Sequence, residues 1–546
     1  MDPTHRIGEY LIERLQAHGV EHVFGVPGDY VLGFMDLLTK SSLQLINTCD
    51  EQGAGFAADA YARLRGLGVV CITYCVGGLK IANTTAQAYA ERSPVVVISG
   101  SPGAGERARN PLLHHTVRTF ETQLRVFEQI TGASTVLLDP GTALAEIDRV
   151  LNVALRQKLP VYIEIPRDLY NSPASHAHPR VTVSPEGDPE ALREALAEAA
   201  EKIRAARQPV ILAGEQLHRF ALQKPLLALL ARSGIPFATT LLSKSVLEED
   251  HPSYIGVYSG GISRSEVVRY VEESDCLLML GSLMTDINLG IYTANLSQRR
   301  TVYADSERVA VGYHRYENVL FEDFVRGLAA LDLPQRSGVT HPRPETPSPF
   351  VPEPGRPLTV ARLFQCLNAC VDKQTVVLAD PGDAMLGSMD LLIDSEAQFL
   401  APAYYTSLGF AVPGALGAQF ANTNLRPLVL VGDGAFQMTG MELATIARYG
   451  LDPIVVVLNN RGYGTERPML DGSFNDVLNW HYSRLPDFLG AGIGFDVHTE
   501  DELEYALGAA IAYRDGFSIL DVHLDPSDRS PALDRLTEAL GRRVRV

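Results

Sequence analysis

The sequence predicts an α/β protein with parallel sheets, arranged in three consecutive blocks. Strand-like apolar runs alternate with segments of helical period along nearly all of its 546 residues, and parallel strands need such helical crossovers. A chain of this length corresponds to three or four domains of ordinary size. The third observation is a proline-rich segment, residues 333–357, which separates the last part of the chain from the rest.

The first block is expected to span residues 1–180. It begins with a helix on which Ile7, Leu11 and Leu15 recur every four residues. Apolar runs then predict short strands, namely Val23–Val26, Leu43–Thr48, Val69–Tyr74, Val95–Ile98 and Val161–Ile165. Residues 172–179 are rich in serine, proline and histidine and are expected to form a loop or linker.

The second block, residues 188–332, carries predicted strands at Val210–Ala213, Leu277–Leu280 and Thr301–Ala304. Closely spaced prolines make residues 333–357 unsuitable for a helix or an inner strand, so this segment is expected to be a linker. The third block, residues 358–546, repeats the strand–helix alternation of the first.

Composition favours a soluble globular protein. Hydrophobic residues make up 46% of the chain and charged residues 21%. The net charge of −18 argues against nucleic acid or an anionic membrane as a partner. No apolar run reaches the roughly 18 residues of a membrane span, and the first residues lack the apolar segment of a signal peptide. Six cysteines are too few for a disulfide scaffold, so a cytoplasmic location is expected.

The most informative stretch follows Leu428–Val431, an apolar run of strand type. Gly432-Asp433-Gly434-Ala435 forms a turn, and the helical period of Met438–Tyr449 places free amides at a helix N-terminus, which attracts phosphate. The next apolar run ends in Asn459-Asn460. Asp433 and Asn460 supply the hard oxygens that Mg²⁺ prefers. Each motif alone also fits a plain turn or strand exit, but ligands of open α/β sheets bind at such strand ends.

This pattern resembles the signature of the thiamine-diphosphate enzymes, which is Gly-Asp-Gly, about 25 residues, then Asn-Asn. Here 24 residues separate Gly434 from Asn459. The resemblance covers essentially the whole chain. It implies three doubly wound parallel-sheet domains: a pyrimidine-binding domain in the first block, a central domain in the second, and a domain that binds diphosphate and Mg²⁺ in the third.

Four polar residues of the first block gain a role through this resemblance. On local grounds Asp29 reads as a helix N-cap, Glu51 as a first-turn carboxylate, and His114-His115 as a solvated pair. The family implies that Glu51 hydrogen-bonds N1′ of the aminopyrimidine. The histidine pair resembles that of the pyruvate, indolepyruvate, phenylpyruvate and branched-chain keto-acid decarboxylases. Those enzymes also have an aspartate matched by Asp29, and a glutamate matched by Glu466.

The resemblance also implies the contacts of the cofactor. Leu408 matches the bulky side chain over which thiamine diphosphate bends, and the carbonyl of Thr406 faces its 4′-amino group. Asp383 is expected near the diphosphate. The implied cofactor-binding residues are Glu51, Asp383, Thr406, Leu408, Gly432, Asp433, Gly434, Ala435 and Asn460. The implied metal ligands are Asp433, Asn460 and the carbonyl of Gly462.

The implied reaction is the non-oxidative decarboxylation of a 2-oxo acid to an aldehyde and CO₂, through an enamine on thiamine diphosphate. Asp29, His114, His115 and Glu466 would handle protons.

The expected substrate pocket contains Ile287, Met385, Thr465 and Met469. Because Thr465 is shorter than isoleucine and Met385 slimmer than tryptophan, the predicted substrate is bulky: phenylpyruvate, indolepyruvate, or a branched or medium chain. The polar Thr465 departs from the expected aliphatic residue, so the choice among these acids stays open.

Two alternative functions remain. A carboligase of the acetolactate-synthase kind would lack the histidine pair and would often bind FAD, but the central block has no G-x-G-x-x-G turn. A non-catalytic protein would have little reason to keep Glu51, Asp433, Asn460 and Glu466. The resemblance also implies a homodimer or homotetramer with the cofactor between subunits. The pathway, any allosteric activation and the residue that protonates the enamine stay open.

Overall fold

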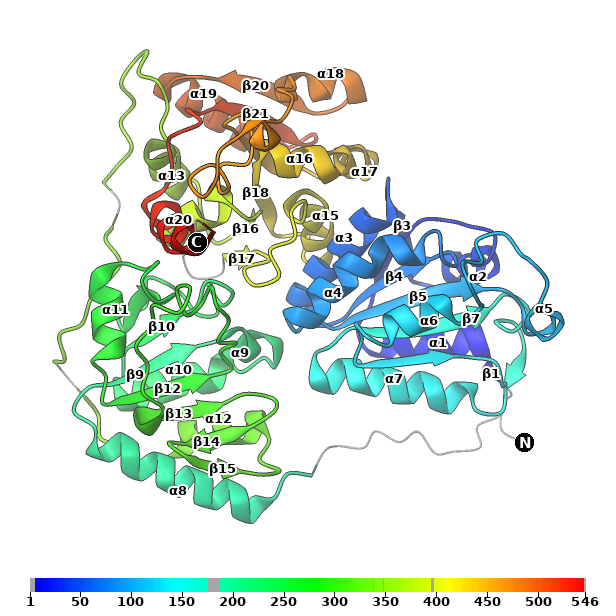
Figure 1. Ribbon diagram of the computed structural model, residues 1–546, viewed down its shortest axis with the longest axis horizontal. Helices are drawn as coiled ribbons and strands as arrows, with labels where there is room; N and C mark the ends of the chain where they lie inside the picture. The colour runs from blue at the N-terminus through cyan, green and yellow to red at the C-terminus, as the bar shows by residue number, and fades with distance from the viewer. Residues whose placement is uncertain (1–4, 175–185, 337, 347, 394–396, 545–546) are drawn as a thin grey trace.

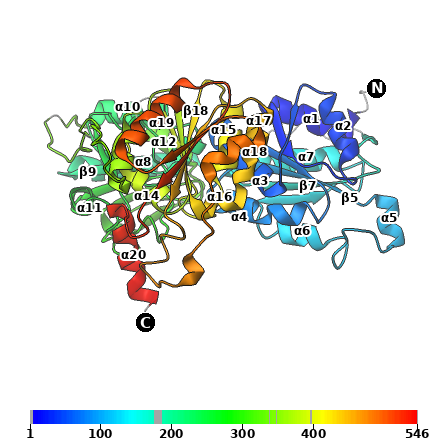
Figure 2. The same ribbon diagram turned by 90° about the horizontal axis from the view of Figure 1, so that it is seen from above.

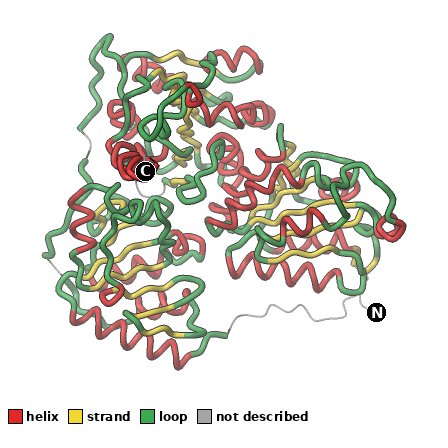
Figure 3. Tube along the Cα trace, in the orientation of Figure 1, coloured by secondary structure: helices red, strands yellow, loops and turns green. Residues whose placement is uncertain are grey.

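The computed structural model describes residues 5–174, 186–336, 338–346, 348–393 and 397–544, and its three large sheets lie in three separate α/β units (Figures 1 and 3). In Figure 1 the blue-to-cyan first unit lies on the right, the green second unit at the lower left, and the yellow-to-red third unit at the upper left. Each sheet falls within one predicted block, which confirms the predicted fold class. The exact limits of the blocks stay a prediction.

The first unit contains a six-stranded parallel sheet in the order β3-β2-β4-β5-β7-β6. Its strands are β2 (His22–Gly25), β3 (Gln44–Asn47), β4 (Gly68–Ile72), β5 (Val95–Ser101), β6 (Ala133–Val136) and β7 (Val161–Pro166). Its helices are α1 (Ile7–Ala17), α2 (Leu32–Thr39), α3 (Glu51–Arg65), η1 (Gly78–Ile81), α4 (Ala82–Ala90), α5 (Ala104–Arg109), α6 (Thr122–Phe127) and α7 (Ala143–Gln157). β6 was not predicted, because its four residues are half polar.

A small antiparallel pair joins β1 (His5–Arg6) to β8 (Pro173–Ala174). The expectation of a loop over residues 172–179 is therefore wrong for Pro173–Ala174. A two-residue strand is too short to show a period of its own. The rest of that segment, residues 175–179, lies outside the described residues.

The second unit contains a seven-stranded mixed sheet in the order β11-β10-β9-β12-β13-β14-β15. Its strands are β9 (Pro209–Ala213), β10 (Phe237–Thr239), β11 (Tyr254–Val257), β12 (Cys276–Leu280), β13 (Thr301–Ala304), β14 (Val309–Val311) and β15 (His314–Tyr316). Its helices are α8 (Pro189–Ala205), α9 (Glu215–Arg219), α10 (Gln223–Ser233), α11 (Ser265–Glu272), η2 (Gln298–Arg300) and α12 (Phe321–Ala330). β14 and β15 pair antiparallel at one edge, a departure from the purely parallel sheet that was expected.

The third unit contains a six-stranded parallel sheet in the order β17-β16-β18-β19-β21-β20. Its strands are β16 (Thr375–Ala379), β17 (Gln398–Leu400), β18 (Arg426–Gly432), β19 (Ile454–Asn459), β20 (Ile493–Val497) and β21 (Ser518–His523). Its helices are α13 (Val360–Asn368), α14 (Asp383–Gly387), η3 (Ser388–Asp390), α15 (Ala411–Ala421), α16 (Asp433–Thr439), η4 (Gly440–Glu442), α17 (Leu443–Arg448), η5 (Ser473–Asn475), η6 (Tyr482–Arg484), α18 (Leu485–Leu489), α19 (Glu500–Ala512) and α20 (Pro531–Val544). Across the described ranges of the chain, no helix combines the length and the apolar composition needed to cross a bilayer.

The single helix expected over Met438–Tyr449 is wrong, because this segment is divided among α16, η4 and α17. The break lies at Thr439, whose hydroxyl donates to the carbonyl of Gly409 at 2.7 Å. A Cβ on Gly440 would lie 2.3 Å from the ring of Phe436. The bond from Thr439 to the distant Gly409 and the close local packing of Phe436 on Gly440 therefore override the helical period.

The first and third units share a hydrophobic core along α3 and α15, which lie side by side in Figures 1 and 2. The two helices approach closely because a Cβ on Gly417 would lie 1.9 Å from the carbonyl oxygen of Ala57. Glu51 is the first residue of α3. The packing therefore fixes the position of Glu51 relative to the third unit of the same chain.

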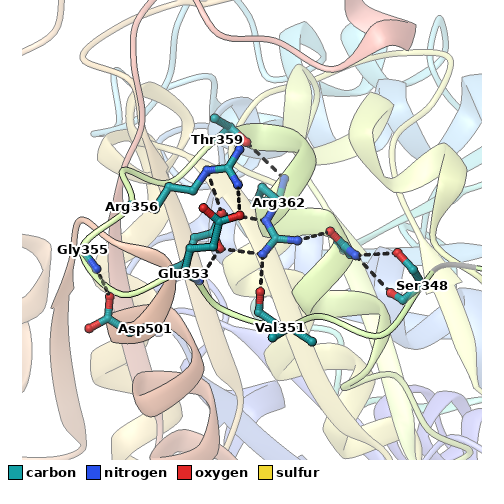
Figure 4. Close-up of polar contacts among 10 residues, drawn as sticks. Ser348, Val351, Glu353, Gly355, Arg356, Thr359, Arg362 and Asp501 are labelled. Atoms are coloured by element: carbon teal, nitrogen blue, oxygen red, sulfur yellow. Dashed lines mark hydrogen bonds and ion pairs between the residues drawn. The ribbon is translucent and has the colours of Figure 1, made fainter.

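The proline-rich linker has no helix or strand among its described residues and lies against the third unit (Figure 4). Arg362 of α13 forms an ion pair with Glu500 at 2.5 Å and donates to the carbonyl of Val351 at 2.7 Å. The amide of Gly355 donates to Asp501 at 2.8 Å. These contacts hold the linker in one path between the second and third units.

Candidate active site

A cavity of about 360 Å³ opens at the carboxyl edge of the third sheet. Loops that follow β16, β17, β18 and β19 meet there, as expected for a ligand site in an open parallel sheet. Every residue that the sequence assigned to this half of the site lines the cavity: Ile287, Asp383, Met385, Thr406, Leu408, Gly432, Asp433, Gly434, Ala435, Asn460, Gly462, Thr465, Glu466 and Met469. The fold thus brings the expected metal ligands and the expected substrate pocket together.

Asp433 is buried and follows directly after β18. One carboxylate oxygen accepts from the amide of Gly434 at 2.7 Å, and the other from the amide of Gly462 at 3.1 Å. Burial raises the pKa of Asp433 to about 6. Within the described part of the chain no cationic side chain lies within ion-pair distance of Asp433, so a divalent cation would offset its desolvation.

The two neighbouring asparagines have different surroundings. Asn459 is buried, and its amide nitrogen donates to Asn479 and to Asp521, at 2.8 Å each. It therefore joins the ends of neighbouring strands. Asn460 lines the cavity instead. A Cβ on Gly464 would lie 2.6 Å from the side-chain nitrogen of Asn460, so a larger residue there would displace this amide.

The cavity wall contains strained backbone and one open stretch. Thr406 and Arg461 have φ angles of 54° and 63°, values that cost energy in residues other than glycine. A Cβ built on Gly432 would meet nothing within 4 Å, so an anion could approach the backbone there. The exposed backbone, the buried carboxylate of Asp433 and the amide of Asn460 fit a diphosphate held by a divalent cation.

Asp383 lines the same cavity but also has a structural contact. Its carboxylate accepts from the amide of Ser530 at 3.0 Å, one residue before α20. Burial raises the pKa of Asp383 to about 6. This residue therefore fixes the start of the last helix as well as lining the cavity.

The Asp29 cluster, which we define as Asp29, His114 and His115, lies at the carboxyl edge of the first sheet. Nε2 of His114 lies 2.9 Å from one oxygen of Asp29, and Nε2 of His115 lies 4.0 Å from the other. His114 stacks on the ring of Tyr30 with ring centroids 5.0 Å apart. The fold thus brings together three residues that the sequence separates by 85 positions.

Glu51 lies at the beginning of α3, with Asp50 as the N-cap that accepts from the amide of Gln52. Its side chain is mostly buried, and Nζ of Lys80 lies 2.6 Å from its Oε2. Neither Glu51 nor the Asp29 cluster lines the cavity. Among the described residues, no hydrogen bond or ion pair joins these side chains to its lining. Within one chain the site therefore consists of two separate halves.

Sequence reasoning missed several residues of both halves. Arg167 follows β7 and lies 3.5 Å from Asp29, with its guanidinium 4.8 Å from the centroid of Tyr30. Asp380 follows β16 and accepts from the amides of Gly409, Phe410 and Ala411, which shapes the loop that carries Leu408. A charged residue shortly after the predicted strand Val161–Ile165 was a usable signal for Arg167, whereas no strand was predicted before Asp380.

The last helix supplies a further wall that was not predicted. Leu533, Leu536 and Leu540 of α20 line the cavity. Their spacing places them on one face of a helix, which could have been read from the sequence. Nothing in that spacing, however, indicates which cavity the face covers.

Comparisons with known proteins agree with this geometry. Family models of the thiamine pyrophosphate enzymes match the N-terminal TPP binding domain at residues 5–123, the central domain at 196–330 and the C-terminal TPP binding domain at 385–522. These matches cover the three units in the order in which the sheets occur.

Curated relatives match along almost the whole chain. An indole-3-pyruvate decarboxylase of Azospirillum brasilense is 36% identical over 98% of this chain and 98% of its own length. Alpha-keto-acid decarboxylases of Mycolicibacterium paratuberculosis and Mycobacterium leprae are 35% and 32% identical, over 96% and 98% of this chain and 94% and 96% of their own lengths. The chain therefore belongs to the family of thiamine-pyrophosphate-dependent 2-oxo acid decarboxylases.

Proposed function

We propose that the protein decarboxylates a bulky 2-oxo acid to an aldehyde and CO₂, without oxidation, using thiamine diphosphate and Mg²⁺. The names of the relatives support this class of substrate. One observation carries the proposal: the expected metal ligands Asp433 and Asn460 line the same cavity as Met385 and Thr465 of the expected substrate pocket. The intact histidine pair makes a carboligase of the acetolactate-synthase kind the weaker alternative.

The third unit would hold the cofactor. The side-chain oxygens of Asp433 and Asn460, with the carbonyl of Gly462, would bind Mg²⁺, and the backbone of Gly432–Ala435 would face the diphosphate. Leu408 would support the bent cofactor, and Thr406 would present its carbonyl. Thiamine diphosphate, when bound, supplies the electron sink for the bond that breaks as CO₂ leaves.

The first unit would handle protons. Glu51 would hydrogen-bond N1′ of the aminopyrimidine. In the Asp29 cluster, the carboxylate of Asp29 orients His114 by a contact of 2.9 Å. Together with His115 and Glu466, this pair would hold and deliver protons at the reacting carbon. Proton transfer by positioned groups is worth about 10²–10⁴ in rate.

We further propose that two chains complete each site, in a homodimer or homotetramer. The cavity in one chain lacks Glu51 and the Asp29 cluster, although the mechanism needs both halves. The first unit of one chain would then close over the cavity of its partner. This arrangement leaves the α3–α15 contact within each chain unchanged.

The reaction is tested by measuring aldehyde release from phenylpyruvate with a coupled dehydrogenase, with thiamine diphosphate and Mg²⁺ added or withheld. We expect cofactor-dependent aldehyde formation that Glu51→Gln abolishes. No aldehyde from any 2-oxo acid of a panel, despite bound cofactor, would contradict the proposal. A highest kcat/KM for pyruvate would contradict the bulky substrate.

The assembly is tested by mixing two inactive variants, Glu51→Gln and Asp433→Asn. If each site combines two chains, half of the mixed dimers are hybrids, and each hybrid has one intact site. Activity should then return to about a quarter of the wild-type value after subunit exchange. If each site belongs to one chain, every site keeps one defect and no activity returns.

We also propose a cytoplasmic location. All six cysteines are free thiols. Reducing compartments keep thiols in this state. Fractionation of cells that express the chain at its natural level would test the location, and recovery from an oxidising compartment would contradict it.

A further inference from the structure

Lys80 forms an ion pair with the carboxylate of Glu51, which the proposed function assigns to cofactor activation. It lies on η1, in the loop that follows β4. Its ammonium lies 2.6 Å from Oε2 of Glu51 and also pairs with the carboxylate of Asp50. The side chain of Glu51 is 12% exposed, while those of Lys80 and Asp50 are 47% and 45% exposed. A cation open to solvent therefore covers a nearly buried carboxylate.

The backbone around Glu51 is fixed, so only side chains can exchange partners. Glu442 of η4 accepts from the amide of Asp50 at 3.0 Å and from the amide of Cys49 at 3.2 Å. A Cβ on Gly77 would lie 3.1 Å from Oε1 of Glu51, so the glycine at this position leaves room for the carboxylate. Hydrogen bonds to Asp50 and then to Glu51 raise the pKa of Lys80, so its side chain stays cationic.

We propose that Lys80 is a positioning residue that pairs with Glu51 in the cofactor-free protein and transfers to Asp50 alone when the aminopyrimidine nitrogen takes its place. Asp50 offers the released ammonium a second carboxylate, so the cation is never left without a partner. The inference rests on the proposed function, because it takes from it the contact between Glu51 and the aminopyrimidine.

This exchange predicts opposite effects for two variants. Lys80→Met frees Glu51 in advance, so thiamine diphosphate should bind about three- to tenfold more tightly. Asp50→Asn removes the second acceptor, so Lys80 stays on Glu51 and binding should weaken by a similar factor. The amide side chain introduced by Asp50→Asn would keep the capping bond that Asp50 now makes to the amide of Gln52 at 2.8 Å. A merely structural role of Lys80 would not produce shifts of opposite sign.

The experiment measures the Kd of thiamine diphosphate by titration calorimetry, on the full chain at saturating Mg²⁺. The variants are Lys80→Met, Asp50→Asn and Lys80→Arg, each alone and combined with Glu51→Gln. We expect opposite shifts for the first two, a Kd near the wild-type value for Lys80→Arg, and no effect of Lys80→Met once Glu51 is replaced. Thermal unfolding of each variant checks that the fold is retained.

Two failures can be told apart. If the wild-type chain does not bind thiamine diphosphate, the proposed function fails and the inference fails with it. If the wild-type chain binds, but Lys80→Met weakens binding or leaves it unchanged, the inference alone is overturned. An effect of Lys80→Met that persists in the Glu51→Gln background also overturns it.

Discussion

The cavity of the third unit and the Asp29 cluster of the first unit both lie at the carboxyl edge of a parallel sheet, but they differ in burial. Asp433 is 1% exposed, whereas the side chains of Asp29 and His114 are 44% and 56% exposed. The residues that line the cavity all come from one chain, whereas the cluster is open to solvent. On the proposed function, the half that would bind the cofactor is preorganised, while the half that would handle protons needs to be covered.

The two halves also differ in how their charges are balanced. In the first unit Asp29 faces His114 and Arg167, and Glu51 faces Lys80. In the third unit the described side chains leave Asp433 without an ion pair. The buried carboxylate of Asp433 therefore has a desolvation cost that a bound cation would offset. The carboxylates of the first unit, in contrast, already have protein partners.

The largest effect is expected at the contact between the first and third units, which carry the two halves of the site. Arg63 of α3 is buried and donates to Asp59 and Glu91 at 2.7–2.9 Å. Glu91 also accepts from the amides of Tyr404 and Tyr405 in the third unit. Arg63→Met leaves two buried carboxylates unpaired, which should lower the free energy of unfolding by about 3–5 kcal/mol.

Urea unfolding of the cofactor-free protein measures this loss. Arg65→Met is the matched control, because the partner of Arg65, Glu21, is 58% exposed, and such pairs are worth less than about 1 kcal/mol. Equal, small losses for both variants would mean that this contact does not hold the two units together.

In the half of the site that belongs to the third unit, Asp433→Asn should weaken cofactor binding without lowering the stability of the protein. Loss of groups that merely orient a metal ligand costs about 10–100-fold, so loss of the ligand should weaken cofactor binding by more than about a hundredfold. The unfolding temperature of the cofactor-free protein should stay equal or rise, because a buried charge is removed. Calorimetric titration with thiamine diphosphate and Mg²⁺ measures the affinity.

In the half of the site that belongs to the first unit, Asp29→Asn should lower kcat and leave cofactor binding nearly unchanged. Because Asp29 orients His114, we expect kcat to fall by about 10²-fold. Cofactor affinity should change by less than about threefold, since Asp29 is exposed. A large loss of affinity in this variant would show that the two halves do not divide binding from proton transfer.

The free energy of unfolding should depend on pH through Glu215 of α9, in the second unit. Burial raises the pKa of Glu215 from 4.5 to about 7. The folded chain therefore keeps a proton that the unfolded chain releases, and this stability is lost as the pH rises from 4.5 to 7. Glu215→Gln stays neutral, so above pH 7 it should be more stable than the wild type by about 3 kcal/mol.

Urea unfolding at pH 5 and pH 8 tests this effect. Glu190→Gln serves as the control, because the side chain of Glu190 is 76% exposed. If the difference between Glu215→Gln and the wild type is the same at both pH values, the carboxyl of Glu215 does not hold a proton in the folded chain.

The smallest effect is expected at the substrate end of the cavity. Met385 is buried in its lining, so Met385→Trp should fill space that a bulky substrate needs. The ratio of kcat/KM for phenylpyruvate to that for pyruvate should fall by about tenfold. Met438→Trp, at a residue that is 50% exposed in the same unit, should leave the ratio unchanged.

Much of the cavity of the third unit was predictable because its residues come from the ends of strands. Gly432–Gly434 lie at the end of β18, and Asn460 and Glu466 follow β19, the neighbouring parallel strand, so few arrangements of these residues are possible. The Asp29 cluster was predictable only through a family resemblance, since no local period links Asp29 to His114. Arg167 and the leucines of α20 were missed, because their role depends on how distant segments pack.

The sequence by itself determined the alternation of strands and helices, the linker and the types of residue at the strand ends, because hydrophobic period and turn chemistry are local properties. Only the tertiary structure decided that α16 breaks at Thr439 and that Lys80 covers Glu51. It also decided that the site is divided into two halves within one chain. These features depend on contacts between residues far apart in the chain, such as those of Thr439 with Gly409 and of Lys80 with Glu51, and such contacts form only when the chain packs into its tertiary structure.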